Sequence, residues 1–558
     1  MTPTWSTACP DWERRIVARE SLIPFDPLFP EEAKASLQVF NDLRMVDAPG
    51  SPTLGEISRD WVTDFVSSIF GAYDAETGRR LVTEFFMLIS KKNGKSSSAA
   101  GIMMTALTRN WRMSGEFLIL APTIEIANNS FFPARDMVRA DEELSDLYQV
   151  QEHTKTIKHR NTDAILKVVA ADSDTVSGKK AIGVLIDELW LFGKQPNAEN
   201  MIREATGGLA SRPEGFTVFL STQSDTPPAG VFKQKLQYAR DVRDGKIEDN
   251  RFLPVLYEFP DAMIKEQKHR DKAYFYVTNP NLGASVDAEY LEREFKKAEN
   301  AGEESMRGFL AKHLNVEIGL NLRTDRWAGA EFWEEQGVRI VTLDTLIDEC
   351  EVVDVGIDGG GLDDLLGFAA IGRHKETQQW IAWTHAWAHP SVLKRHKQEA
   401  ARFEDFSNDG DLTLVTQIGD DVAELASMVS RIEEAGLLDK VGCDPQGLGG
   451  IVDALHAAEI PEDKIIGISQ GWKMTGAIKT AERKLAEGAM IHGGQPMMAW
   501  CVGNAKVVPS GNATLITKQA SGSAKIDPLM ALLNAVTLMS LNPESRKSVY
   551  EERGLTLI

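Results

Sequence analysis

Two groups of residues with the chemistry to handle phosphate follow one another along the chain. The first half contains Ser90-Lys91-Lys92-Asn93-Gly94-Lys95-Ser96 and, further on, Ile186-Asp187-Glu188. The second half contains Asp358, Asp444 and Asp527, each at the edge of an apolar segment. The first group is typical of a nucleotide-binding site. The second, three aspartates from distant segments, is typical of a nuclease that uses two metal ions. Their order predicts a nucleotide-driven motor joined to a metal-dependent nuclease.

The first run supplies the parts of a phosphate-binding loop in order. Such a loop presents backbone N–H groups at a helix N-terminus, a lysine for the outer phosphates and a hydroxyl for magnesium. Phe85 to Ile89 would be the buried strand before it, and Ser97 to Leu107 the helix after it. Lys95 would then neutralise the β- and γ-phosphates of ATP, and Ser96 would hold Mg²⁺. Ile89 replaces the first glycine of the pattern G-x-x-x-x-G-K-[ST], so a helix start without a ligand is the alternative reading of this loop alone.

A second motif strengthens the nucleotide interpretation. Val184 to Ile186 is apolar and ends in two carboxylates, Asp187 and Glu188. We expect Asp187 to lie behind the ligands of the magnesium and Glu188 to face the attacking water. Acidic pairs also occur as solvated strand ends. This pair follows a Gly-Lys-Ser loop within an alternating α/β stretch, which favours its role in the nucleotide site.

Two further features could link hydrolysis to movement. Ser221-Thr222-Gln223 ends another apolar strand, and its polar groups are predicted to sense the γ-phosphate and pass hydrolysis to the parts that grip DNA. Arg203 and Arg212 flank this region, and either is a candidate arginine finger, acting in cis or across a ring interface. Single arginines more often form surface ion pairs, so both are weak candidates.

The three later aspartates are predicted to form the nuclease centre. Asp358 closes a strand-like run and is followed by glycines that would let a metal and a phosphodiester approach the backbone. Asp444 ends a similar run, and Asp527 precedes the helical stretch Leu529 to Leu541. Cleavage by two metals needs carboxylates that converge on ions about 4 Å apart, so two Mg²⁺ or Mn²⁺ ions are expected. Each acid alone is more often a turn or cap residue, and the prediction depends on the set.

Weaker candidates accompany this centre. Asp364 is the expected fourth metal ligand, with the neighbouring Asp363 as the alternative register. Lys518 and Lys525 could contact the scissile backbone, although lysines are usually solvated.

Apolar runs alternate with helical periodicity in both halves, which predicts two α/β units. In the first half the alternation indicates a mainly parallel sheet flanked by helices. The expected strands are residues 81–89, 116–121, 182–186 and 217–221, then 352–357, 366–372, 379–383 and 441–443. The expected division is a helical lead-in over 1–60, a first α/β domain over 61–318, a connector over 319–350, a second α/β domain over 351–543 and a tail over 544–558.

Composition narrows the class of protein. A formal net charge of -21 would repel nucleic acid if it were evenly spread. We therefore expect DNA to be contacted by local patches of basic residues, with salt-sensitive binding. The same acidic charge predicts that the free protein is a monomer. The four cysteines lack the spacing of a zinc site or a disulfide framework, which favours a reducing cytosol. No apolar run approaches the roughly 20 residues that span a bilayer, and no signal-peptide pattern is present. We therefore expect no membrane contact.

These motifs resemble those of the large terminase subunit of tailed bacteriophages, over about Trp61 to Leu541. Further similarity lies in Thr278-Asn279-Pro280-Asn281-Leu282-Gly283, in His313-Leu314-Asn315 and in His492-Gly493-Gly494-Gln495-Pro496. The resemblance implies an N-terminal P-loop ATPase domain of the ASCE type and a C-terminal ribonuclease H-like nuclease domain. It also implies that a missing first glycine is ordinary in this loop, and that Lys91 or Lys92 assists phosphate binding.

The same resemblance implies a biological setting. Such a subunit hydrolyses ATP to translocate double-stranded phage DNA into a procapsid and cuts the concatemeric DNA. Its partners would be the portal protein, the small terminase subunit, the procapsid and copies of itself, in a ring usually of five subunits. It would reside in the host cytoplasm, dock transiently on the procapsid and be absent from the mature virion.

Two other functions compete with this hypothesis. A helicase-nuclease of restriction or repair usually carries two motor domains, whereas the second half here has no second phosphate loop. A structural assembly adaptor with vestigial motifs would not need to retain Lys95, Glu188 and all three nuclease acids.

Overall fold

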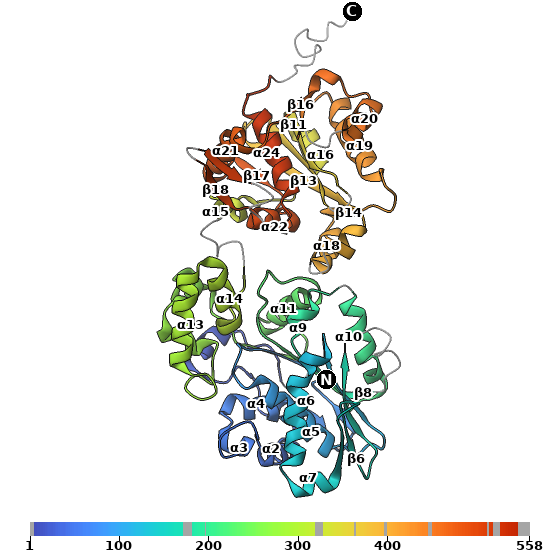
Figure 1. Cartoon of the computed structure of the whole chain (residues 1–558), viewed down its shortest axis with the longest axis vertical. Coiled ribbons are helices and arrows are strands. Elements are labelled where there is room, and N and C mark those ends of the chain that lie inside the picture. The colour runs from blue at the N-terminus through green and yellow to red at the C-terminus, as the bar shows by residue number, and fades with distance from the viewer. Residues whose placement is uncertain are drawn as a thin grey trace, which may run out of the picture. The chain divides into compact units, whose positions relative to one another are not determined.

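The chain forms two compact units, Met1–Ile318 and Gly319–Ile558, each considered by itself (Figure 1). The computed structural model describes residues 5–170, 181–195, 197–318, 327–361, 364–395, 399–444, 449–510, 513–516 and 525–544. Asp363, Lys518 and residues 545–558 of the expected tail lie outside the described residues. Within the described part of the chain, no helix is both long and apolar enough to cross a bilayer.

An eight-stranded sheet forms the centre of the first unit, in the order β10-β3-β9-β8-β4-β7-β6-β5. All pairs from β10 to β7 are parallel, whereas β6 and β5 are added antiparallel. The strands are β3 Glu84–Leu88, β4 Glu116–Ala121, β5 Tyr148–Gln151, β6 Thr156–His159, β7 Ile165–Ala170, β8 Ala181–Ile186, β9 Phe216–Ser221 and β10 Phe252–Leu256. The four strands expected in this half are confirmed as β3, β4, β8 and β9. Their apolar runs are buried because parallel sheets are covered on both faces.

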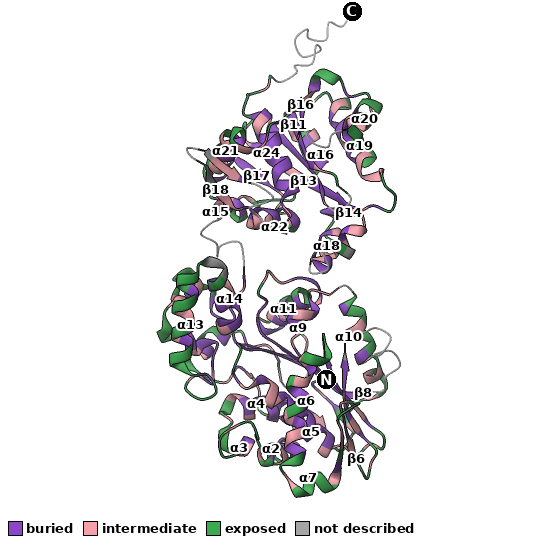
Figure 2. Cartoon of the chain, in the orientation of Figure 1, coloured by how far each residue is buried: buried purple, intermediate pink, exposed green. Residues whose placement is uncertain are grey.

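Helices cover this sheet (Figures 1 and 2). On one face, Phe86 and Leu88 point into a core shared with α9, α10 and α11. On the other face, Phe65 of α4 meets Phe85 edge-on, with ring centroids 6.4 Å apart. The helices are α1 Trp12–Ala18, α2 Pro30–Asp42, α3 Leu54–Ile57, α4 Asp60–Phe70, α5 Lys95–Thr108, α6 Ile124–Arg139, α7 Glu142–Leu147, α9 Leu189–Phe192, α10 Ala198–Gly207, α11 Gly230–Arg243, α12 Asp261–Lys265, α13 Ala288–Ala301 and α14 Glu303–Leu314. A two-stranded ribbon, β1 Tyr73–Asp74 and β2 Arg79–Arg80, lies apart from the main sheet.

The second unit has a mixed sheet in the order β14-β13-β12-β11-β15-β16, with β17 also paired to β13. β11, β12 and β13 are antiparallel neighbours, whereas β15 and β16 run parallel to β11. The strands are β11 Cys350–Gly359, β12 Leu366–His374, β13 Trp380–Ala388, β14 Leu412–Leu414, β15 Leu438–Cys443, β16 Ile465–Gly467, β17 Met490–His492 and the separate hairpin β18 Val507–Ser510 with β19 Ala513–Ile516. The expected α/β class with mainly parallel pairing in the first half is confirmed.

Helices pack on both faces of this second sheet. The side chains of β11 point to both faces of the sheet. On one face, Val353, Val355 and Ile357 pack with α16, α19 and α20. On the other face, Val352 packs with α21, α22 and α24. The helices are α15 Ala330–Trp333, α16 Leu343–Glu349, α17 Ser391–Arg395, α18 Ala400–Asn408, α19 Asp420–Glu434, α20 Gly449–Ala457, α21 Thr475–Ala486, α22 Pro496–Asn504 and α24 Asp527–Met539.

Helix α24 lies unusually close to the sheet. Gly356 of β11 allows this approach, because a Cβ atom there would overlap the carbonyl oxygen of Ala531. The helix is buried along nearly its whole length. This packing fixes Asp527, the first residue of α24, beside the end of β11.

Candidate nucleotide and nuclease sites

Three neighbouring strands of the first sheet carry the residues predicted for the nucleotide site. β9 lies between β3 and β8, and all three run parallel. The phosphate loop follows β3, Ser221-Thr222-Gln223 begins at the end of β9, and Asp187 follows β8. Because parallel strands end at one edge of a sheet, the three segments meet there.

The loop turns sharply before it enters helix α5. Lys92 and Gly94 have left-handed backbone angles, with φ of 73° and 79°. The buried Asn93 side chain fixes this turn: its Nδ2 donates to the Ser90 carbonyl at 3.0 Å and to Asn279 Oδ1 at 2.9 Å. Its Oδ1 accepts from the Asn281 backbone N–H at 3.0 Å. A segment nearly two hundred residues further along the chain therefore holds the loop.

Lys95 is held by both predicted carboxylates. Its Nζ lies 2.5 Å from Glu188 Oε1 and 3.5 Å from Asp187 Oδ1. Asp187 Oδ2 also accepts from Ser130 Oγ at 2.9 Å. Burial alone would lower the pKa of Lys95, but the two carboxylates outweigh it and raise that pKa. Burial would likewise raise the pKa of Glu188, and Lys95 outweighs it, so Glu188 is ionised.

The carboxylate of Glu188 is oriented by a second donor. Trp190 Nε1 donates to Glu188 Oε2 at 2.6 Å, and the Trp190 backbone N–H donates to Ser221 Oγ at 3.1 Å. Glu188 itself has a left-handed backbone with φ of 53°, which is uncommon for a residue other than glycine and is found at functional sites. The strand ends of β8 and β9 are thus joined around this glutamate.

The two candidate arginine fingers make only local contacts among the described residues. Arg203 lies exposed on α10 and bonds Asn200, while Arg212 donates to the neighbouring Ser211 carbonyl at 3.3 Å. A finger that acts across a ring interface would meet its phosphate on another subunit.

Sequence reasoning assigned no role in the site to four side chains that build it: Ser130, Trp190, Lys312 and Asn315. Lys312 Nζ donates to the Gln223 carbonyl at 2.8 Å, and the Lys312 carbonyl accepts from the Lys91 N–H at 2.8 Å. Asn315 Oδ1 accepts from the Gln223 N–H at 3.1 Å. The run His313-Leu314-Asn315 entered the resemblance, but nothing in its local pattern indicates contact with the loop.

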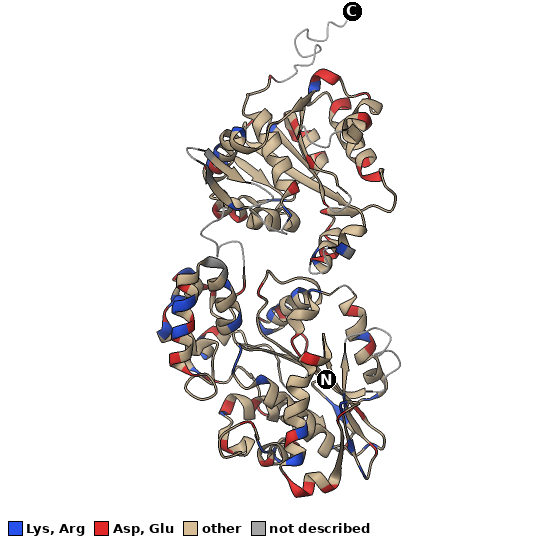
Figure 3. Ribbon diagram, in the orientation of Figure 1, with Lys and Arg blue, Asp and Glu red and all other residues tan. Residues whose placement is uncertain are grey.

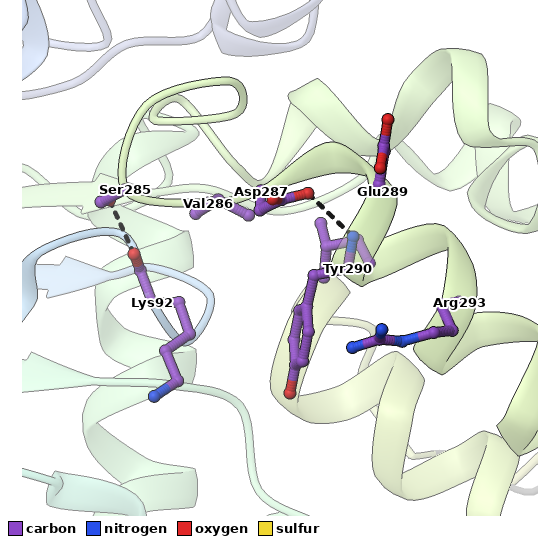
Figure 4. A pocket seen from close by; sticks show the side chains of 8 residues that line it. Lys92, Ser285, Val286, Asp287, Glu289, Tyr290 and Arg293 are labelled. Carbon is purple, nitrogen blue, oxygen red and sulfur yellow. Dashed lines mark hydrogen bonds between the residues drawn. The ribbon is translucent and has the colours of Figure 1, made fainter.

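A pocket of about 570 Å³ opens beside the loop (Figure 4). Lys92 forms one wall, and Ser285 Oγ donates to the Lys92 carbonyl at 2.7 Å. Tyr290, at the start of α13, lies across the pocket from Lys92, and the Arg293 guanidinium is 5.7 Å from the centroid of its ring. Asp287 caps this helix by accepting from the Tyr290 N–H at 2.9 Å. An aromatic face and two cationic side chains therefore stand next to the phosphate loop.

The three acids predicted for the nuclease centre lie at one edge of the second sheet. Ile357 of β11 pairs with Cys443 of the parallel β15, so Asp358 and Asp444 follow on adjacent strands. A Cβ atom on Gly359 would lie 3.1 Å from Asp527 Oδ1, which places the third acid beside the end of β11. Asp358 and Asp527 are buried, and the Gln470 side-chain amide donates to Asp358 Oδ1.

These acids are not gathered into a closed ligand set. Among the described residues, no three His, Cys, Asp or Glu side chains are grouped closely enough to hold a metal ion. Asp364 forms an ion pair with Lys525, whose Nζ lies 2.9 Å from Asp364 Oδ1. The carboxylate predicted as a fourth ligand and the lysine predicted to touch DNA thus contact each other.

Fold and sites together define a P-loop ATPase of the ASCE type followed by a ribonuclease H-like nuclease. Two family models match the chain: "Terminase large subunit, ATPase domain" over residues 60–241 and "Terminase large subunit, endonuclease domain" over residues 246–542. The chain belongs to the terminase large subunit family. The expected resemblance is confirmed, together with the ATPase and endonuclease activities of these domains.

Individual relatives are distant. The terminase large subunit of Lactococcus phage p2 is 21% identical over 471 residues, which cover 82% of each chain. That of Enterobacteria phage HK97 is 23% identical over 486 residues, covering 84% of this chain and 88% of the relative. The crystal structure of the HK97 large terminase aligns with a TM-score of 0.47 at 19% identity, covering 91% of this chain and 99% of that one.

Proposed function

We propose that this chain is the motor and nuclease subunit of a tailed phage that packages double-stranded DNA into a procapsid and cuts the concatemer. The observation that supports it most is the position of Lys95 at the start of α5, directly after the phosphate loop, with its Nζ 2.5 Å from Glu188 Oε1. Family membership favours this function over a helicase-nuclease of restriction or repair.

In the proposed ATPase reaction, the phosphates of ATP would bind the backbone N–H groups at the start of α5. Their negative charge competes with Glu188 for Lys95, which frees the carboxylate. Trp190 keeps that carboxylate in place, so that it can orient the attacking water and take its proton. Ser96 would hold Mg²⁺, with Asp187 behind the ligands of the ion, and the ion would neutralise charge on the phosphates when bound.

The pocket beside Lys92 is the proposed place for the nucleoside. Stacking on an aromatic ring is the usual way to hold a base without reading its edge. Tyr290 supplies an exposed ring there, and Arg293 lies over it. The space of about 570 Å³ is of the size typical for small-molecule sites.

For the nuclease, Asp358, Asp444 and Asp527 would hold two Mg²⁺ or Mn²⁺ ions. A set made only of carboxylate oxygens suits such hard cations, and two of the three acids are buried at one sheet edge. Bound ions would activate water and stabilise the leaving oxygen. We assign Asp364 with Lys525 to the rim of this centre, where an ion pair could open toward a metal or a phosphate.

The remaining parts of the proposal concern coupling and partners. Ser221-Thr222-Gln223 would transmit hydrolysis, and Arg203 or Arg212 would act as the arginine finger of a neighbouring subunit. The partners would be the portal protein, the small terminase subunit and further copies in a five-membered ring on the procapsid, in the host cytoplasm. Figure 3 shows acidic and basic residues interspersed over both units, which suits local rather than global attraction of DNA.

The test separates the two centres in the full-length chain. Lys95→Ala should abolish magnesium-dependent ATP hydrolysis and leave manganese-dependent DNA cleavage intact. Asp358→Ala should do the reverse. Loss of both activities in either variant, with the fold retained, would contradict the assignment of separate centres.

A further inference from the structure

We propose that Lys312 is a positioning residue of the ATPase: it acts on Glu188 through the indole ring of Trp190. The inference rests on the proposed ATPase reaction and adds a residue to it. The Lys312 Nζ contacts the Gln223 carbonyl and the Trp190 ring, so its effect would be on the orientation of Glu188 and on its strength as a base.

The contact between Lys312 and Trp190 is direct. The Lys312 Nζ lies 2.9 Å from the centroid of the Trp190 ring, and the N–H at the edge of the same ring donates to Glu188 at 2.6 Å. A cation over the face of an indole is attracted by its π electrons. It also draws electron density from the ring N–H, which strengthens the hydrogen bond to Glu188.

Lys312 is held in a buried position, which is unusual for a lysine. Its side chain is 8% exposed. The two carboxylates that act on its charge, those of Asp225 and Glu188, are paired with Lys194 and Lys95. The Gln223 carbonyl and the Trp190 ring are its partners, while its own carbonyl accepts from the Lys91 N–H. A buried ammonium held by a carbonyl and a ring face is poorly compensated, and such an arrangement is retained where it has a role.

The electrostatic surroundings make this cation responsive to pH. Burial lowers the pKa of Lys312 to about 7, and Lys91 and Lys194 also lower it, while Asp225 and Glu188 oppose them. Below this pKa the ring carries its cation, and above it the cation is lost. The kcat/KM for ATP, which reports the free enzyme, should therefore fall as pH rises through neutrality.

The experiment compares substitutions at Lys312 and Trp190 in the full-length protein. Lys312→Met and Trp190→Phe should each lower kcat about tenfold and leave the affinity for a non-hydrolysable ATP analogue unchanged. Lys312→Arg, which stays charged, should restore kcat and remove the decline of kcat/KM between about pH 6 and pH 8. Thermal unfolding checks that each variant is folded.

Lys194→Met is the matched control. Lys194 Nζ lies 4.9 Å from the same ring centroid but is paired with Asp225 at 2.6 Å. Its replacement should change kcat less than twofold. A normal kcat in Lys312→Met, or equal loss in Lys312→Arg and Lys312→Met, would overturn the inference. A wild-type protein without ATPase activity would instead overturn the proposed function.

Discussion

Replacement of Glu188 by Gln is the most direct test of the ATPase chemistry. The change exchanges one carboxylate oxygen for an NH₂ group of nearly the same size. In the structure both oxygens accept: Oε1 from Lys95 at 2.5 Å and Oε2 from Trp190 Nε1 at 2.6 Å. Glutamine has one acceptor oxygen, so one of these donors would face an NH₂ group.

Two magnitudes follow from this geometry. A positioned general base contributes about 10²- to 10⁴-fold to a rate, which is roughly 3–5 kcal/mol of activation free energy at about 1.4 kcal/mol per tenfold. We expect kcat to fall by that factor. One mismatched buried donor should lower the free energy of unfolding by about 1–3 kcal/mol, while Lys95 keeps Asp187 as a partner at 3.5 Å.

The assay measures phosphate release with Mg-ATP, together with ATP affinity and thermal unfolding. Affinity should be retained or rise, because a neutral side chain no longer competes with the phosphates for Lys95. Glu84→Gln is the control, since Glu84 also meets a lysine, Lys235, at 3.0 Å, but at the start of β3 with 42% of its side chain exposed. If Glu188→Gln hydrolyses ATP within twofold of the wild-type rate, the assignment of Glu188 as the base is wrong.

Two further predictions concern other regions of the chain. Burial, with help from Asp439, raises the pKa of Asp354 to about 8. Because the pKa of Asp354 is higher in the folded than in the unfolded state, the stability that this acid contributes is complete at low pH and is lost as pH rises through about 8. Asp354→Asn should therefore flatten the pH dependence of the thermal unfolding temperature above pH 5. An unchanged slope in this variant would contradict the prediction. Tyr290→Ala should raise the Kd for ATP about tenfold because stacking on the base is lost, whereas Tyr290→Phe, which keeps the ring, should bind like the wild type. Equal affinities of the wild type and both variants in binding titrations would exclude the ring from the nucleoside site.

The strand ends that carry the candidate sites were predictable because their signals are local. A short apolar run that ends in Gly-Lys-Ser or in Asp187-Glu188 specifies a strand and the polar residues after it. Parallel pairing then brings such ends to one edge of the sheet without further information. The same geometry applies to Asp358 and Asp444, which follow paired residues of the neighbouring parallel strands β11 and β15.

The partners that hold those ends could not be predicted, because they come from distant parts of the chain. Lys312 lies in the last turn of α14, where a lysine is usually a solvated cation that complements the helix dipole. Only the packing of α14 shows it to be buried against Trp190. The same holds for Asp364: its charge is equally compatible with a metal ligand, and its ion pair with Lys525 joins residues more than a hundred positions apart in the sequence.

We propose that the segment between β10 and Ile318 carries the effect of ATP hydrolysis out of the nucleotide site. It packs in the first unit, although the endonuclease family model begins at residue 246. It holds the phosphate loop through Asn281 and Lys312, and Asn315 bonds the end of β9 shortly before the unit boundary. A shift of the loop on phosphate binding would therefore move hydrogen-bonded groups that continue directly into the chain leading to the nuclease unit. Asn315→Ala should therefore separate hydrolysis from DNA movement more cleanly than variants in the loop or at Lys312. The Asn315 side chain bonds the Gln223 N–H and the Tyr257 carbonyl, so its loss leaves Lys95 and its carboxylates in place.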